Sequence, residues 1–149
     1  MKKKWLLKFW NFWPPFLFTG IQILYCSRDY HHIKAKLKLR FWNANYVGTQ
    51  YGGSIFSLAD PFYMVMLINN LGKNYIVWDK ASTIRYLKPG KTDLYADFIL
   101  KDEELESIIE EVREKGKSEW IKVIPILDAH NNTVAEITKT ITIKAKPKS

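Results

Sequence analysis

One short segment, residues 43–66, brings backbone donors and a carboxylate together in the sequence NANYVGTQYGGSIFSLADPFYMVM. A glycine-rich turn (Gly48, Gly52, Gly53) leads into an apolar stretch that contains one acidic residue, Asp60. Glycine permits positive φ at such a junction, and the first N–H groups of a following helix can bind an anion or a carbonyl oxygen. A carboxylate in apolar surroundings has a raised pKa, which suits a general base or a nucleophile. The segment therefore predicts a site in which backbone donors and a reactive carboxylate lie close in sequence.

Asp60 also has a purely structural interpretation, because Pro61 follows it directly. Proline suits the first position of a helix, and aspartate is a favoured residue just before that position. The pair could restart a helix after a kink, with backbone N–H groups donating to the carboxylate and lowering its pKa. The same kink could instead direct Asp60 into a cleft, so the sequence leaves both interpretations open.

Composition predicts one folded domain with a basic surface. The chain has 149 residues, 47% of them hydrophobic, and a net charge of +8, so it is long enough for a substantial core. The charge favours anionic partners such as acidic lipid or a phosphorylated small molecule, or else lysine simply solvates the exposed faces. Nucleic-acid binding rests on charge alone and is not expected.

The residues that would indicate a disulfide, a metal or a cofactor are too few or badly spaced. Cys26 is the only cysteine, which excludes an intrachain disulfide and fits a reducing compartment, so we expect a cytoplasmic protein. His31, His32 and His130 lack the spacing of metal ligands, and we expect no metal site. The sequence has no dinucleotide-binding or phosphate-loop motif, so no cofactor is expected.

The N-terminal residues 1–26 have a basic start and an apolar body, as signal peptides and membrane anchors do. Pro14-Pro15 would break a spanning helix, and the apolar run is shorter than the roughly 20 residues that a bilayer requires. We therefore predict two short helices, over residues 3–13 and 16–25.

This N-terminal segment is expected to be a helical unit over residues 1–30, packed on a domain that occupies residues 31–149. Alternatively, the segment lies on a membrane surface with Trp5, Trp10 and Trp13 at the interface. In that case the protein would be peripheral at the membrane.

The rest of the chain predicts one sheet and two helices. Residues 33–42 alternate between apolar and basic side chains over most of their length, which predicts a half-buried antiparallel strand. Residues 54–70 are apolar on every side in their middle, which predicts a fully buried helix. An amphipathic helix is predicted over residues 102–116, and further strands over residues 74–86, 91–101, 118–127 and 133–146. This order predicts an α+β domain in which one antiparallel sheet wraps around one long central helix.

The glycine-rich segment resembles the signature Asn-x-x-Gly-x-x-His-Gly-Gly-x6-Asp of PaaI-like acyl-CoA thioesterases, which have the hotdog fold. The residues that match it are Asn45, Gly48, Gly52, Gly53 and Asp60. The wider pattern resembles the DUF4442 family of the same superfamily. It consists of Pro14-Pro15-Phe16, Gly20-Ile21, Asp60-Pro61-Phe62-Tyr63-Met64, Tyr75-Ile76-Val77-Trp78-Asp79-Lys80 and Leu87-Lys88-Pro89-Gly90.

The resemblance implies an acyl-CoA or acyl-carrier-protein thioesterase that works as a homodimer or a dimer of dimers. The substrate would enter at the subunit interface, where two central helices lie side by side. The amides around Gly52 and Gly53 would polarise the thioester carbonyl. Asp60 would attack the carbonyl or activate water, and Asn45 would orient the water or the substrate.

The chain departs from the signature at Tyr51, which stands where the thioesterases have histidine and follows Gln50. Either side chain can donate a hydrogen bond, so we include both among the substrate-binding candidates. Asp79 and Lys80 are adjacent and point to opposite faces of a strand, and Asp79 is either a substrate contact or part of a buried ion pair. The departures favour a second hypothesis, a non-catalytic hotdog module that binds an acyl chain or a lipid.

Overall fold

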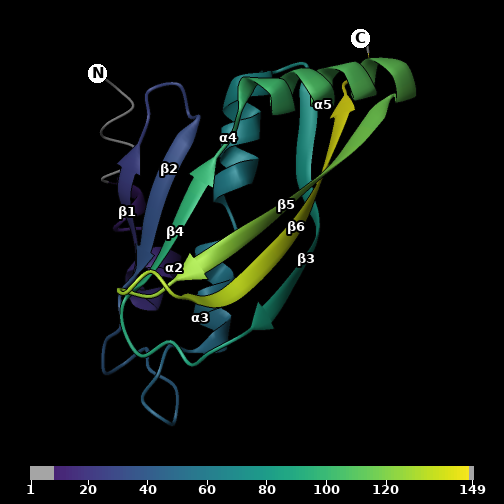
Figure 1. Ribbon diagram of the computed structural model, residues 1–149. Helices are drawn as coiled ribbons and strands as arrows, with labels where there is room; N and C mark the ends of the chain where they lie inside the picture. The colour runs from purple at the N-terminus through teal and green to yellow at the C-terminus, as the bar shows by residue number, and fades with distance from the viewer. Residues whose placement is uncertain (1–8, 148–149) are drawn as a thin grey trace.

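The computed structural model describes residues 9–147, which form one antiparallel sheet with helices packed against it (Figure 1). The sheet of the described chain has six strands in the order β1-β2-β4-β5-β6-β3, so that β1 and β3 are its edges. In chain order the strands are β1 (Ile21–Cys26), β2 (His32–Leu37), β3 (Tyr75–Tyr86), β4 (Leu94–Ile99), β5 (Lys117–Leu127) and β6 (Thr133–Ala145).

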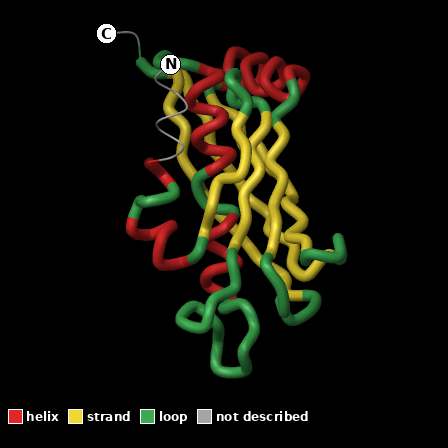
Figure 2. The backbone as a smooth tube through the Cα atoms, turned by 90° about the vertical axis from the view of Figure 1, so that its left-hand side faces the viewer, coloured by secondary structure: helices red, strands yellow, loops and turns green. Residues whose placement is uncertain are grey.

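The helices lie along one face and at one end of this sheet. Those described in full are α2 (Pro14–Thr19), α3 (Gly52–Leu58), α4 (Phe62–Leu71) and α5 (Asp102–Lys115). Figure 2 shows α3 and α4 following each other along the same face, with α2 outside them, while α5 crosses the end where β5 begins. Between residues 9 and 147, we find no helix with both the length and the apolar character to cross a bilayer.

The core lies between α4 and the sheet. Phe62 is fully buried, and its ring centroid lies 4.7 Å from that of Phe98 on β4. Tyr63 also packs on Phe98, at 5.3 Å, and its hydroxyl lies within hydrogen-bonding distance of the Ile99 backbone. Burial raises the pKa of Tyr63 to about 12, so this hydroxyl is neutral in the folded protein at ordinary pH. The α+β domain with a central helix packed on the sheet is confirmed, but the helix is not buried on every side in one chain, since Phe56 on α3 is 37% exposed and Ile68 on α4 is 45% exposed.

The central helix is interrupted, which corrects the prediction of one continuous helix over residues 54–70. Residues 59–61 separate α3 from α4. Pro61 has no N–H to continue the helical ladder, and the Asp60 N–H instead donates to the Ser57 carbonyl at 3.1 Å. The residue just before α4 is Pro61 and not Asp60, and no side chain caps this helix.

The second predicted N-terminal helix, over residues 16–25, is wrong beyond residue 19. Gly20 ends α2 in the left-handed region (φ 93°), where its N–H donates to the Phe16 carbonyl at 2.9 Å. The chain then becomes β1, in which Ile21 and Ile23 turn into the core while the strand pairs with β2. Of the first predicted helix, over residues 3–13, the part up to residue 8 lies outside the described residues.

The predicted strand over residues 33–42 ends early, at Leu37. The chain leaves the sheet there because side chains from elsewhere occupy its backbone groups. The Asn43 amide donates to the carbonyls of Lys38 and Thr19, at 2.8 and 2.9 Å. An Asp93 carboxylate oxygen accepts a hydrogen bond from the Leu39 N–H at 2.9 Å. The predicted strand over residues 91–101 is likewise shorter and forms β4, whereas the other strand predictions agree with the structure to within a residue or so at each end.

Candidate active site

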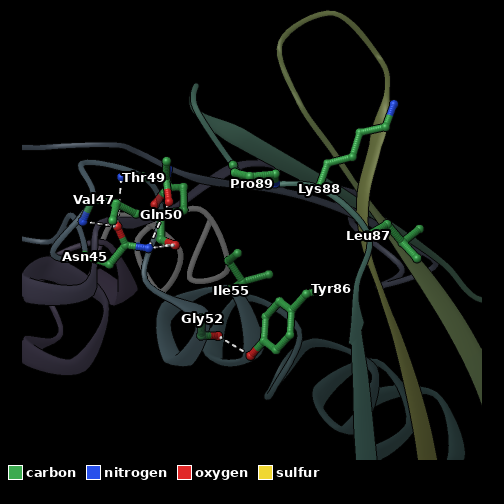
Figure 3. Close-up of a pocket in the computed structure, with 11 residues that line it drawn as sticks. Asn45, Val47, Thr49, Gln50, Gly52, Ile55, Tyr86, Leu87, Lys88 and Pro89 are labelled. Atoms are coloured by element: carbon green, nitrogen blue, oxygen red, sulfur yellow. Dashed lines mark hydrogen bonds between the residues drawn. The ribbon is translucent and has the colours of Figure 1, made fainter.

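The glycine-rich turn is held together by the side chain of Asn45 (Figure 3). Its Oδ1 accepts hydrogen bonds from the N–H groups of Val47 and Thr49, at 3.1 and 3.0 Å. Its Nδ2 donates to the Thr49 hydroxyl at 2.8 Å and to the Gln50 carbonyl at 3.3 Å. Both ends of this amide are therefore used inside the turn, and Asn45 fixes the path of the backbone toward α3.

Gln50 fastens the turn to its neighbours and is almost fully buried. Its Nε2 donates to the carbonyls of Leu37 and Thr92, at 3.1 and 3.0 Å, and its backbone N–H donates to Gly90 at 2.8 Å. Within the described part of the chain its Oε1 is buried and has no hydrogen-bond partner. The side chain thus ties three segments together and leaves one buried acceptor unused.

Helix α3 begins at Gly52 without a capping side chain, because the preceding residue is Tyr51. Two tyrosine side chains leave no room for a side chain at Gly52 or Gly53. A Cβ on Gly52 would lie 2.8 Å from the Tyr86 hydroxyl oxygen, and one on Gly53 would lie 2.5 Å from a Tyr51 ring carbon. The Tyr86 hydroxyl in turn donates to the Gly52 carbonyl at 3.0 Å. Neither of these glycines has positive φ, contrary to the expectation from the sequence; in this turn only Gly48 does, at 79°.

A cavity of about 460 Å³ opens beside the start of α3. The turn contributes Asn45, Gln50 and Gly52 to its wall, and the segment after β3 contributes Lys88 and Gly90. Figure 3 shows the end of the Lys88 side chain extending away from the turn and from the other labelled lining residues. We call this space the turn cavity.

Asp60 lies in the break between α3 and α4, with its side chain 69% exposed. No backbone N–H of residues 9–147 donates to its carboxylate, so the interpretation of Asp60 as a helix cap is wrong. The carboxylate is also not alone in apolar surroundings, as the sequence suggested, because the Lys139 Nζ lies 3.7 Å from its Oδ1. It lines a second cavity, of about 190 Å³, with Trp13, Phe16 and Phe56. We call this space the Asp60 cavity.

Lys139 on β6 is the residue that the sequence analysis missed. Its side chain is 1% exposed, and its Nζ donates to the Asp60 backbone carbonyl. The same ammonium forms an ion pair with Asp79 on β3, with 3.0 Å between Nζ and Oδ2. One signal in the sequence could have revealed it, since every second residue of β6 faces the core and Lys139 interrupts an otherwise apolar series, Ala135, Ile137, Ile141 and Ile143.

Asp79 is the inward member of the adjacent pair on β3. Its side chain is 26% exposed and faces Lys139, whereas Lys80 lies on the other side and pairs with Glu119 at 2.5 Å. A shift in the β3–β6 register at this point places Lys80 in a bulge between Asp79 and Ala81. Of the two roles predicted for Asp79, a substrate contact or a buried ion pair, one chain shows the ion pair, and its partner is Lys139.

The DUF4442 family model, described as a domain of unknown function, matches residues 3–143. The chain belongs to the DUF4442 family. No curated protein matches the chain in sequence. Solved structures with the same fold include proteins whose descriptions name a thioesterase activity, at identities of 15–18% to this DUF4442 protein.

Three of these structures illustrate the likeness. PA5026 from Pseudomonas aeruginosa, described as a probable thioesterase, has a TM-score of 0.83 at 18% identity, over 97% of this chain and 96% of its own. PaaI from the phenylacetic acid degradation operon of E. coli has a TM-score of 0.64 at 18% identity, over 99% and 96%. The protein smu.793 from Streptococcus mutans UA159, solved with acetyl CoA bound, has a TM-score of 0.59 at 21% identity, over 88% and 94%. Together they show that the DUF4442 chain has the hotdog fold.

In this DUF4442 chain the candidate residues fall into two separate groups. Asn45, Gln50 and Gly52 line the turn cavity at the start of α3, while Asp60 lines the Asp60 cavity just beyond the end of α3. Asp60 follows Gly52 by eight positions, which in a helix correspond to a rise of about 12 Å. The donors and the carboxylate are therefore close in sequence but do not share a cavity within one chain.

Proposed function

We propose that the protein is a cytoplasmic thioesterase that hydrolyses an acyl-CoA or an acyl-carrier-protein thioester. The observation that carries this proposal is the Asp60 carboxylate, which is exposed, accepts no hydrogen bond from a backbone N–H of residues 9–147 and lies beside the buried ammonium group of Lys139. The hotdog fold that the chain shares with a probable thioesterase and with an acetyl-CoA-bound protein supports the substrate class. The basic surface would attract the phosphates of such a substrate.

In the proposed reaction, water and a thioester give a carboxylic acid and a free thiol. Asp60 takes the proton of the attacking water, or attacks the thioester carbon itself and is released by water in a second step. The N–H groups of Gly52 and Gly53 at the start of α3 polarise the thioester carbonyl and stabilise the oxyanion. Tyr51 is 58% exposed beside them and can donate its hydroxyl to the substrate.

The proposed site is completed by a second subunit, because one chain keeps Asp60 and the start of α3 apart. Strand β3 supports a dimer: it is a twelve-residue edge strand that pairs only with β6 among the described strands. An exposed edge of that length is a template for pairing with another copy. In a dimer, or a dimer of dimers, Asp60 of one subunit would face the α3 amides of the other.

Release of thiol from a panel of acyl-CoAs of increasing chain length tests this function. We expect turnover by the wild type and a loss of about 10³-fold in kcat for Asp60→Asn, with the melting temperature unchanged because the side chain is exposed. Asp97→Asn is the matched control, since Asp97 is a half-exposed carboxylate that pairs with His32 and Lys34 on β2. Absence of turnover on every substrate, or equal kcat for wild type and Asp60→Asn, would refute the proposal.

A specific observation favours a second candidate, a non-catalytic module that binds an acyl chain or lipid at a membrane surface. Residues in and before α2 expose large aromatic side chains: Phe9 and Phe12 are 73% exposed and Phe18 is 70% exposed. Such rings partition into the headgroup region of a bilayer. Cosedimentation with anionic vesicles, by a protein that turns over no thioester, would support this candidate over the thioesterase.

A further inference from the structure

We propose that Lys139 is a positioning residue that holds Asp60 in place for the reaction. The inference rests on the proposed function of Asp60, but its geometry stands on its own. Lys139 occupies a core position of β6, where its neighbours on the same face are alanine and isoleucine. Its ammonium group reaches across the core to the break between α3 and α4, where Asp60 lies.

Three contacts converge on the Lys139 Nζ, and they come from two other elements. It donates to the Asp60 backbone carbonyl, lies 3.7 Å from the Asp60 Oδ1, and forms the 3.0 Å ion pair with Asp79 on β3. The ammonium thus contacts both the backbone and the side chain of Asp60. Asp79 holds the same ammonium through the ion pair, so the Lys139 side chain is restrained by groups on β3 and in the break.

The hydrogen bonds that the break makes with its own N–H groups are local. The N–H groups of Ala59 and Asp60 donate to Phe56 and Ser57, at 3.2 and 3.1 Å, which are residues of the preceding turn of α3. Among the described residues, the hydrogen bond from Lys139 is the one that links residues 59–61 to the sheet. Apolar packing of Ala59, Leu58 and Phe62 seats this segment in the core, and the Lys139 hydrogen bond adds a polar link at Asp60 itself.

A buried lysine is a costly way to fill a core position. An apolar side chain of similar volume, with an apolar partner, is often as stabilising as a buried ion pair or more so. We therefore explain the Lys139–Asp79 pair by the positioning of Asp60, the carboxylate to which we assign the chemistry, and not by a gain in the stability of the fold.

The test is a variant in which both buried charges are replaced, Lys139→Met together with Asp79→Leu, so that neither charge is left unpaired in the core. The control is Lys80→Met, which removes a neighbouring ion pair on the other side of β3. Two quantities are measured on the full chain: hydrogen exchange of the amides in residues 58–64, and kcat and KM on the best acyl-CoA of the panel. A fourth protein adds the double replacement to Asp60→Asn.

We expect the double variant to fold and its amides in residues 58–64 to exchange at least about five-fold faster than in wild type. We expect kcat to fall about 10- to 100-fold with KM changed less than about two-fold, because misplacement of a reacting group affects the reaction step. In the Asp60→Asn background the same replacement should cause no further loss of kcat, since both changes act through Asp60. Lys80→Met should leave the exchange rates and kcat at their wild-type values.

The two proposals fail in different ways. If the wild type releases no thiol from any substrate, the thioesterase proposal fails, while the exchange measurement still decides whether Lys139 holds the break. Unchanged exchange in residues 58–64 would overturn the positioning role whatever the activity. With an active wild type, unchanged kcat, a loss in KM alone, or losses that add to that of Asp60→Asn would also overturn it.

Discussion

The glycine-rich turn and the Asp60 break lie at opposite ends of the same short helix, and they are held by opposite means. The turn is held by neutral hydrogen bonds, most of them within a few residues, as in the four made by the Asn45 side chain. The break packs on the core through apolar side chains, and among the described residues its hydrogen bond to the sheet comes from one buried charge 79 residues away in sequence. Mostly local hydrogen bonds therefore shape the part of the proposed site that supplies the backbone donors. A contact between residues distant in sequence holds the part that supplies the carboxylate.

This difference predicts that the two halves respond differently to mutation. Loss of a partner in the break leaves a charge in the core, whereas loss of a partner in the turn leaves only neutral groups unsatisfied. The unpaired charge in the core lowers the free energy of unfolding more than the unsatisfied neutral groups do.

The largest effect is expected for Lys139→Met alone. It leaves the Asp79 carboxylate without its cation, and we expect the free energy of unfolding in urea to fall by about 3 kcal/mol. Addition of Asp79→Leu should return the stability to within about 1 kcal/mol of wild type, because no charge then remains in the core. If Lys139→Met alone is as stable as the wild type, the predicted difference between the break and the turn is wrong.

A smaller loss of stability is expected for Gln50→Leu in the turn. The replacement removes the hydrogen bonds that Gln50 donates to the carbonyls of buried Leu37 and half-buried Thr92, at a cost of about 2 kcal/mol in the same urea experiment. Gln22→Leu on β1 serves as control and should change stability by less than about 0.5 kcal/mol, because no hydrogen bond of this side chain is seen among the described residues. A larger loss for Gln50→Leu than for Lys139→Met would reverse the proposed order.

The smallest effect is expected for Tyr51→Phe, which removes only a hydroxyl from an exposed ring. Stability should be unchanged, because the ring still packs over Gly53. If the hydroxyl contacts the thioester, kcat/KM should fall about five-fold, the size of one neutral hydrogen bond. An unchanged kcat/KM would remove Tyr51 from the substrate contacts and leave the α3 amides as the donors.

Much of the fold was predictable because its signals are local. The alternation in residues 133–146 and the amphipathic pattern in residues 102–116 each specify one element, and both are found as predicted. Residues 16–25 misled because a short apolar run fits a buried strand as well as a helix, and Gly20 ends the helix inside it. The spacing of apolar residues over so short a run could not show that the helix gives way to a strand at Gly20.

The candidate site was less predictable, for a physical reason. The apolar neighbours of Asp60 in the sequence predict a buried carboxylate. In the structure Asp60 lies in the break before α4, and its side chain is exposed. Its partner Lys139 is distant in sequence, so only the folded sheet brings the two together. The match to the thioesterase signature identified candidate residues, but it could not show that the Asn45 amide bonds within the turn or that the Gln50 amide bonds to the neighbouring segments.

The central claim is that the active site joins Asp60 of one subunit to the start of α3 of another, and subunit mixing tests it most directly. Two inactive homodimers are prepared, Asp60→Asn and Gly52→Val, the second chosen because a side chain at Gly52 would collide with Tyr86 and disturb the α3 amides. After exchange of subunits, each mixed dimer carries one site with both defects and one with none. Random mixing of equal amounts should then restore about one quarter of the wild-type rate of thiol release. A mixture that forms mixed dimers but stays inactive would contradict the account, because each site would then lie within a single chain.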